Sequence, residues 1–191
     1  MVARAAATTP VTPGDTMSTT LNPIPSTQTL DFVEAMTSLA SGVVVVTSRV
    51  GGRPWGMTIT AFTSVSADPP TVLVSVGADT ASASSVAETN RFGVSILSAD
   101  QLAVARYGAA AGAPKFLEPF VDPGSASASP AIDGALAHLD CDVVHAFPAA
   151  DHIVFFGRVR AATGGTGGDP LVYGRRAYAT VSSSDSERKP R

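Results

Sequence analysis

The residues best suited to chemistry lie in one segment, GMTITAFTSVSADPP, from Gly56 to Pro70. It has no charge before Asp68, and its hydroxyl residues are Thr58, Thr60, Thr63, Ser64 and Ser66. Apolar Met57, Ile59 and Ala61 alternate with Thr58 and Thr60, which predicts a strand with its apolar side on a core. From Phe62 onward the polar groups predict a binding loop, ended by two prolines that lack N–H donors. Such a loop suits a flat, mostly neutral ligand with many donors and acceptors, although the same hydroxyls often only stabilise turns.

A second group of reactive residues could suggest a metal site: His138, Cys141, His145 and His152. If residues 138–147 form a strand, however, His138 and Cys141 lie on opposite faces. Cys141 and His145 would then be roughly 13 Å apart, at about 3.3 Å per residue. No bound metal is therefore expected.

The elements that position these residues are mostly strands. They are predicted over residues 43–47, 55–62, 71–76, 92–97, 136–147 and 152–162, with further short strands near the end. Gly51-Gly52 predicts a hairpin turn, as does PAAD before His152. Helices are predicted over residues 82–89 and 99–109, and from Asp31, which has capping-box spacing to Glu34, to a stop at Gly42. The apolar stripe of this first helix is Phe32, Val33, Met36, Leu39 and Ala40.

Strands outnumber helices and do not alternate regularly with them, so the expected fold is mainly β, a closed antiparallel barrel with a few flanking helices. Residues 1–28 and 181–191 are predicted to be disordered tails around one domain, residues 29–180. Residues 111–130 are rich in Ala, Gly, Ser and Pro, and are predicted to form a mobile loop over the site or at a dimer seam. A further loop is expected at residues 163–169.

Composition limits the partners. Of the 191 residues 45% are hydrophobic and only 15% charged, which favours a homodimer that buries uncharged surface. A formal net charge of −3 disfavours nucleic acid. Cys141 is the single cysteine, so no intrachain disulfide is expected, and no apolar run is long enough for a membrane span. Without a convincing signal peptide, the expected location is cytoplasmic.

Several catalytic motifs are missing. No G-x-G-x-x-G opens a helix after a strand, so any nicotinamide cofactor must bind without a Rossmann unit. The P-loop and the G-x-S-x-G elbow are also missing.

Several ordered motifs between about Phe32 and Tyr178 resemble those of the short-chain flavin reductases. They are FVEAMTSLASGVVVVT, GMTITAFTSVSADPP, RFGVSILSADQ, ALAHLDCDVV, DHIVFFGRV and PLVYGRRAY. The resemblance implies an FMN-binding split barrel. It also implies an NAD(P)H:flavin oxidoreductase that supplies diffusible reduced flavin to a partner flavin-dependent monooxygenase. The flavin would be FAD or FMN, with FAD slightly favoured, and the hydride donor NADH or NADPH.

The resemblance also implies the site residues. His152, in Ala150-Asp151-His152, matches the histidine of a Gly-Asp-His motif on the nicotinamide side of the flavin and is the catalytic candidate. The implied flavin contacts are Thr60, Ala61, Thr63, Ser64, Val65, Ser66, Thr80, Ser82, Ser95, Ser98, Gln101, Tyr173 and Arg175. Two departures are that Ser95 replaces an asparagine common in relatives, and that GADTASASS lacks the basic residue often found there.

Other interpretations of these residues stay open. Thr80 and Ser82 could simply cap a helix, and His152 could be a solvated turn residue. Arg175 and Arg176 could blunt an edge strand or form a cationic wall near the flavin. At the level of function, the alternatives are a non-catalytic flavin- or haem-binding carrier or sensor, and a flavin-dependent oxidase.

Overall fold

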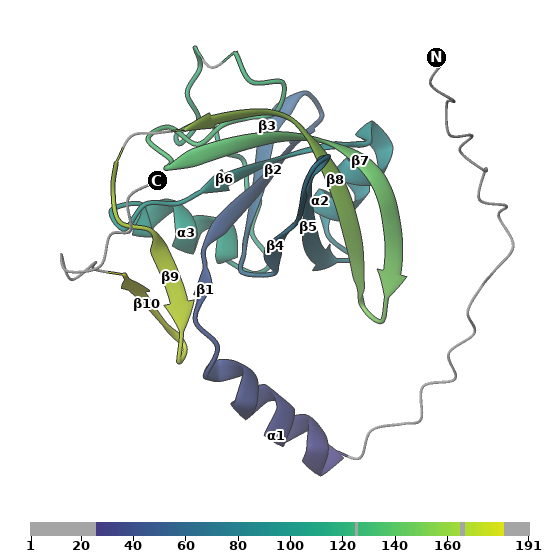
Figure 1. Cartoon of the computed structure of the whole chain (residues 1–191), viewed down its shortest axis with the longest axis vertical. Helices are drawn as coiled ribbons and strands as arrows, with labels where there is room; N and C mark the ends of the chain where they lie inside the picture. Colours follow the sequence, from purple (N-terminus) through teal and green to yellow (C-terminus); the bar gives the residue numbers. More distant parts are fainter. Residues whose placement is uncertain (1–25, 125, 165–166, 182–191) are drawn as a thin grey trace, which may run out of the picture.

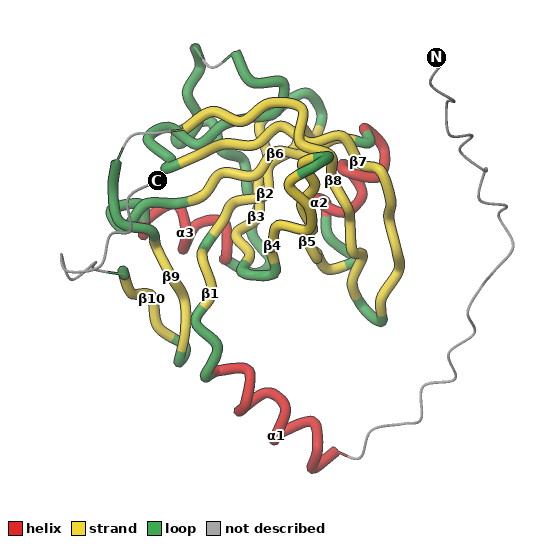
Figure 2. Tube along the Cα trace, viewed as in Figure 1, coloured by secondary structure: helices red, strands yellow, loops and turns green. Residues whose placement is uncertain are grey.

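Strands dominate the computed structural model, which describes residues 26–124, 126–164 and 167–181. The helices are α1 (Ser26–Thr37), α2 (Ala81–Thr89) and α3 (Leu102–Ala109). The strands are β1 (Ser41–Gly42), β2 (Val44–Val50), β3 (Arg53–Ile59), β4 (Phe62–Ala67), β5 (Pro70–Gly77), β6 (Arg91–Ile96), β7 (Ala137–Ala149), β8 (His152–Gly164), β9 (Leu171–Gly174) and β10 (Ala177–Thr180). The prediction of a mainly β, antiparallel fold with few helices is confirmed (Figures 1 and 2). No helix among the described residues is long and apolar enough to cross a bilayer.

The strands form two antiparallel sheets. The larger has the order β3-β2-β6-β7-β8-β5-β4, and the smaller has the order β1-β9-β10. The outermost strands of the larger sheet, β3 and β4, are consecutive in the chain and are joined only by Thr60 and Ala61. The sheet must therefore curl until its two edges approach each other at this link.

Two predicted hairpin turns form for local reasons. Gly51 and Gly52 have φ of 58° and 78°, the positive values that a tight turn between β2 and β3 needs. Ala150 and Asp151 join β7 to β8, with Ala150 at φ 54° and Ala149 paired with His152. The short helix predicted at residues 82–89 is α2, which begins after its N-cap Thr80 and ends at left-handed Asn90.

The core has two parts, one on each side of β2 and β6. Val44, Val46, Val74, Phe92 and Phe155 belong to the first part, which α2 covers with Ala83 and Val86. Val43, Val45, Leu97, Val104 and Leu117 belong to the second, which α3 covers. Phe62 packs against the first part, and Trp55 donates to Ser82 at 3.1 Å.

The first helix differs from its prediction. It begins at Ser26 and ends at Thr37, so the helix runs through Asp31, and Gly42 lies in β1 instead of ending the helix. In Figure 1 it projects away from the larger sheet. Phe32 is 64% exposed and Leu39 is 57% exposed, so the apolar stripe does not pack into the core of its own chain. The predicted disordered tails fall mostly outside the described residues, and the domain boundaries stay predictions.

The segment predicted as a mobile loop at residues 111–130 is instead anchored in its described part, through Phe116 and Leu117. Leu117 has no exposed surface, and its amide donates to Pro54 O at 2.9 Å. Phe116 packs edge-on against Trp55, with ring centroids 5.0 Å apart. A few apolar side chains, Phe116 and Leu117 among them, therefore hold this segment on the domain, although most of its residues are small or polar.

Candidate functional site

Pairing across β4, β5 and β8 places predicted site residues from distant segments on one face of the sheet. Thr63 pairs with Leu73 on β5, and His152 pairs with Gly77 on the same strand. Side chains of directly paired residues lie on the same face of a sheet. Alternate residues along one strand, such as Leu73, Ser75 and Gly77 of β5, also share a face. Thr63 and His152 therefore lie on one face, opposite buried Val74 and Phe155. We call this face, formed by the outward residues of β4, β5, β8 and β7, the outer face.

The β7–β8 turn holds His152 in solvent. Its side chain is 46% exposed, and its Nδ1 lies 2.8 Å from Asp151 Oδ1. This hydrogen bond lowers the pKa of the Asp151 carboxyl. The turn is fixed to the end of β5, because the Ala78 amide donates to Asp151 O at 2.9 Å. The structure therefore orients an exposed imidazole at one end of the outer face.

The hydroxyl-rich segment is not a loop beyond Phe62, because residues 62–67 form the edge strand β4. The Ser66 hydroxyl stabilises the following turn, donating to Asp68 O at 3.0 Å. Thr63 Oγ1 donates to Ser64 O at 3.3 Å, and Val65 lies at an irregularity in the β4–β5 register. Among the hydroxyls of β4, only that of exposed Ser64 makes no hydrogen bond to a described residue. Ala61 continues the pairing, because its carbonyl accepts from the Ser75 amide at 3.0 Å.

Thr80 and Ser82, two of the implied flavin contacts, have structural partners within the chain. Thr80 Oγ1 accepts from the Ala83 amide at 3.1 Å and donates to Gly77 O at 2.7 Å, which is the capping role. The Ser82 side chain is buried and bonded to Trp55, so its hydroxyl is not available to a ligand in this structure. Contacts of Thr80 and Ser82 with flavin therefore stay predictions.

A cavity of about 650 Å³ brings Thr60 together with Tyr173. Its wall is completed by residues of α3 and of the β9–β10 hairpin: Leu102, Arg106, Ala109, Arg176, Ala177 and Tyr178. The rings of Tyr173 and Tyr178 are 5.0 Å apart at 63°. Burial raises the pKa of the Tyr178 phenol, as does Tyr173, while Arg106 acts in the opposite direction. Thr58 also lines the cavity, but its Oγ1 is covered by Gly108 of α3 and has no hydrogen-bond partner among the described residues.

Sequence reasoning missed part of this cavity. No role in the site was predicted for Arg106 from the sequence. A single arginine in a helix of mostly small and apolar residues could have indicated one. Arg176 lines the cavity, whereas the predicted Arg175 does not. The two arginines occupy the β9–β10 turn with φ of 49° and 60°, and this turn geometry was not visible in the sequence.

The other predicted flavin contacts are placed mainly in the framework. Ser95 is fully buried and lies 2.9 Å from His138 Nδ1, so its side chain has no surface for a ligand in this structure. Gln101 accepts from the Ser98 amide at 3.0 Å and donates to Asp133 O at 2.7 Å, while the Ser98 hydroxyl donates to Asp100. These bonds fix the start of α3, which carries Leu102 and Arg106 into the cavity. Contacts of Ser98 and Gln101 with flavin stay predictions.

A buried polar network lies behind the framework. Ser129 Oγ lies 3.0 Å from His138 Nε2 and donates to Asp140, whose carboxylate also accepts from the Ser129 and Ala128 amides. Burial lowers the pKa of His138, although nearby Asp140 acts in the opposite direction. Burial would raise the pKa of Asp140, but its hydrogen bonds from Ser129 and Ala128 outweigh this and lower it. A neutral His138 that donates from Nε2 and accepts at Nδ1 satisfies every partner.

The residues considered for a metal site are dispersed. Cys141 packs in the first core part with Phe92, while His138 lies with Ser95 and Ser129, so the predicted opposite faces are confirmed. Burial raises the pKa of the Cys141 thiol to about 12. No cluster of potential metal ligands occurs within residues 26–124, 126–164 and 167–181.

The fold is shared with flavin reductases of known structure. A Streptomyces globisporus NADH:FAD oxidoreductase, solved with NAD and FAD fragments, matches with a TM-score of 0.76 and 29% identity. That match covers 87% of this chain and all of the other. The flavin reductase component of a bacterial two-component tryptophan halogenase matches with a TM-score of 0.72 and 37% identity, covering 83% of this chain and 99% of the other. The chain thus has the fold of the flavin reductases.

Sequence comparison agrees. An NADH-dependent flavin reductase from a Rhodococcus species is 39% identical over 138 residues, which cover 71% of this chain and 77% of the relative. The reductase component of the Thermus thermophilus 4-hydroxyphenylacetate 3-monooxygenase is 37% identical over 147 residues, or 77% of this chain and 93% of the relative. The model of the flavin reductase like domain matches residues 36–182. The chain belongs to this family, and the resemblance inferred from its motifs is confirmed.

Proposed function

We propose that this protein is an NADH-dependent flavin reductase that supplies reduced flavin to a separate monooxygenase. The observation that carries the proposal is the family match over residues 36–182, which spans all strands of both sheets. Relatives named as NADH-dependent flavin reductases and as reductase components of monooxygenases support the enzyme class, the flavin and the donor. A cytoplasmic location belongs to the same proposal.

The residues around the Thr60–Tyr173 cavity fit a flavin ring. The Thr60 hydroxyl and the phenols of Tyr173 and Tyr178 offer both donors and acceptors. Arg106 and Arg176 supply positive charge, which favours an anionic reduced ring. A bound flavin would supply the hydride acceptor. The protein's contribution is then to hold and orient two rings, which explains why an acid–base triad is not needed.

His152 and the outer face would serve the dinucleotide side of the site. The exposed imidazole, held by Asp151, can donate a hydrogen bond to a carboxamide or a phosphate. Thr60 and Ala61 link the cavity to the outer face, because they join β3 to β4. We further propose that the curled sheet closes as a split barrel, and that two copies form a dimer. The exposed apolar stripe of α1 and the low charged fraction support this dimer.

The test is to mix the protein with NADH and either FAD or FMN and to follow the absorbance of NADH. Catalytic oxidation that requires added flavin supports the reductase. Tight flavin binding without turnover would instead indicate a carrier. Sedimentation at the mass of one chain at micromolar concentration would contradict the dimer but leave the reductase proposal intact.

A further inference from the structure

An uncovered aromatic cluster lies on the outer face of the β7–β8 hairpin. Phe147 is 55% exposed, more than any other described aromatic side chain except Phe32 on α1. Its ring lies 6.0 Å from that of Phe156 at 86°, and 6.1 Å from that of His145. Two perpendicular rings form a corner in which a flat molecule can stack on one ring and meet the other with its edge.

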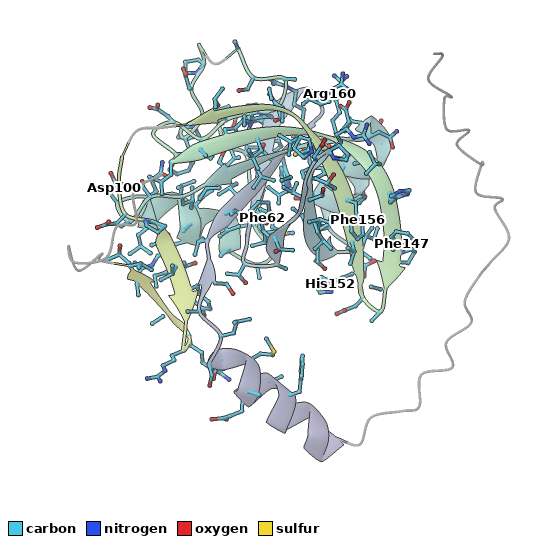
Figure 3. All side chains as sticks on the ribbon, in the orientation of Figure 1. Phe62, Asp100, Phe147, His152, Phe156 and Arg160 are labelled. Carbon is cyan, nitrogen blue, oxygen red and sulfur yellow. The ribbon has the colours of Figure 1, made fainter. Side chains whose placement is uncertain are left out.

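The sheet register places this corner next to His152. Phe147 pairs with Val154, and the neighbouring pair on the same face is Ala149 with His152. Phe147 and His152 are therefore diagonal neighbours, whose Cα atoms lie about 7–8 Å apart in such a ladder. Figure 3 shows Phe147, Phe156 and His152 together in the half of the hairpin that ends at its turn. A ligand held at His152 can reach the corner without crossing a strand of the core.

The charges along β8 indicate what kind of ligand would fit. Outward residues of this strand read His152, Val154, Phe156 and Arg158, which spans roughly 20 Å at about 3.3 Å per residue. Arg158 is exposed and makes no ion pair with a described residue. The carboxylate opposite it in the ladder, Asp142, is paired with two other arginines, Arg91 at 3.3 Å and Arg160 at 3.5 Å. Aromatic rings flanked by an imidazole and a free guanidinium suit a ligand that carries both rings and phosphates.

We propose that Phe147, supported by Phe156, stacks on the adenine ring of NADH. This rests on the proposed function, which puts the nicotinamide end of the same molecule at His152. Since the nicotinamide must meet the flavin for hydride transfer, the adenine is the ring of the donor left to bind elsewhere. Phe147 is in this sense a positioning residue that selects a dinucleotide over its nicotinamide half.

The experiment separates the two halves of the donor. Steady-state kinetics are measured on the full chain with FMN as acceptor, because FMN has no adenine of its own. The donors are NADH and reduced nicotinamide mononucleotide, which lacks the adenosine. The variants are Phe147→Ala, Phe147→Tyr and the matched control Phe32→Ala, which also removes an exposed phenylalanine. Sedimentation of each variant is measured in parallel.

We expect Phe147→Ala to raise the KM for NADH about five-fold or more, the low end of the cost of losing one base–aromatic stack. Its KM for the mononucleotide and its kcat should stay near wild type. Phe147→Tyr should keep the NADH value, and Phe32→Ala should leave the ratio of the two KM values unchanged. Because the Phe147 side chain is largely exposed, the alanine variant should keep the urea midpoint of the wild type.

Three results would overturn the inference. An unchanged KM for NADH, or an equal rise for both donors, would show that Phe147 does not contact the adenosine half. A change in sedimentation on Phe147→Ala would show that a second copy of the chain covers the cluster instead. A wild-type protein that oxidises neither donor would contradict the proposed function itself, and this inference with it.

Discussion

Replacing Ser129 by alanine tests the buried network that ties the segment before β7 to the sheet. The hydroxyl of Ser129 connects His138 Nε2, 3.0 Å away, to the Asp140 carboxylate. Without it the His138 N–H, in a side chain that is 4% exposed, keeps only Asp140 Oδ1 nearby, at 3.5 Å, which is too long for a good hydrogen bond. We expect a loss of about 2–3 kcal/mol in the free energy of unfolding, the range for a buried unsatisfied donor together with a lost bond to a carboxylate.

The same network makes stability depend on pH. The pKa of His138 is lowered in the folded protein, so below about pH 6.5, its unfolded value, the unfolded chain binds more protons than the folded one. The contribution of His138 to the free energy of unfolding is thus fully present above that pH, and it is lost as the pH drops toward the pKa of His138 in the folded protein. The lowered pKa of Asp140 acts in the same direction, below about pH 4.

The assay is urea unfolding between neutral pH and pH 5, at constant protein concentration, followed by the fluorescence of the single tryptophan. Trp55 is a suitable probe because it packs against Phe116 and is bonded to Ser82. His138→Gln should flatten the decline of stability with acid, and Ser84→Ala, an exposed position on α2, should stay within about 0.5 kcal/mol of wild type. An unchanged midpoint for Ser129→Ala at neutral pH, or a wild type stabilised by acid, would refute the reasoning.

Three further predictions concern the site and the sheet. His152→Ala should raise the KM for NADH and slow hydride transfer in stopped-flow experiments, with flavin affinity almost unchanged; a silent variant would remove His152 from the site. Ser64→Ala should instead weaken flavin binding by about 0.5–1.5 kcal/mol in a titration, the usual worth of one neutral hydrogen bond, and equal behaviour of the two variants would contradict the assignment. Gly157→Ala should lower the free energy of unfolding, measured in urea, by about 1–3 kcal/mol or more, because a Cβ there would lie 2.3 Å from the Phe92 ring. The control Gly42→Ala, which has open space around the added Cβ, should leave the free energy of unfolding unchanged.

Elements whose information is local could be predicted from the sequence. The turn at Gly51-Gly52 needs only positive φ, and α2 needs only Thr80 before it and Asn90 after it. The first helix was placed less well, because its apolar stripe does not pack on its own chain and its start could not be inferred from core periodicity. Ser129 could not be assigned at all, because its role depends on His138 and Asp140, which reach it only through the folded sheet.

The outer face shows most clearly where sequence reasoning ends. On β7, Cys141 and Val143 point into the core, so simple alternation would also turn His145 and Phe147 inward. The pairing shifts at Val144, however: Val143 pairs with Gly157 and His145 with Phe156, which leaves Val144 without a partner. One extra residue reverses the alternation, as a β-bulge does, and brings Phe147 onto the face of His152. No residue type in VVHAF marks that bulge, so the aromatic corner could be found only in the structure, although the histidine beside it was found from a motif.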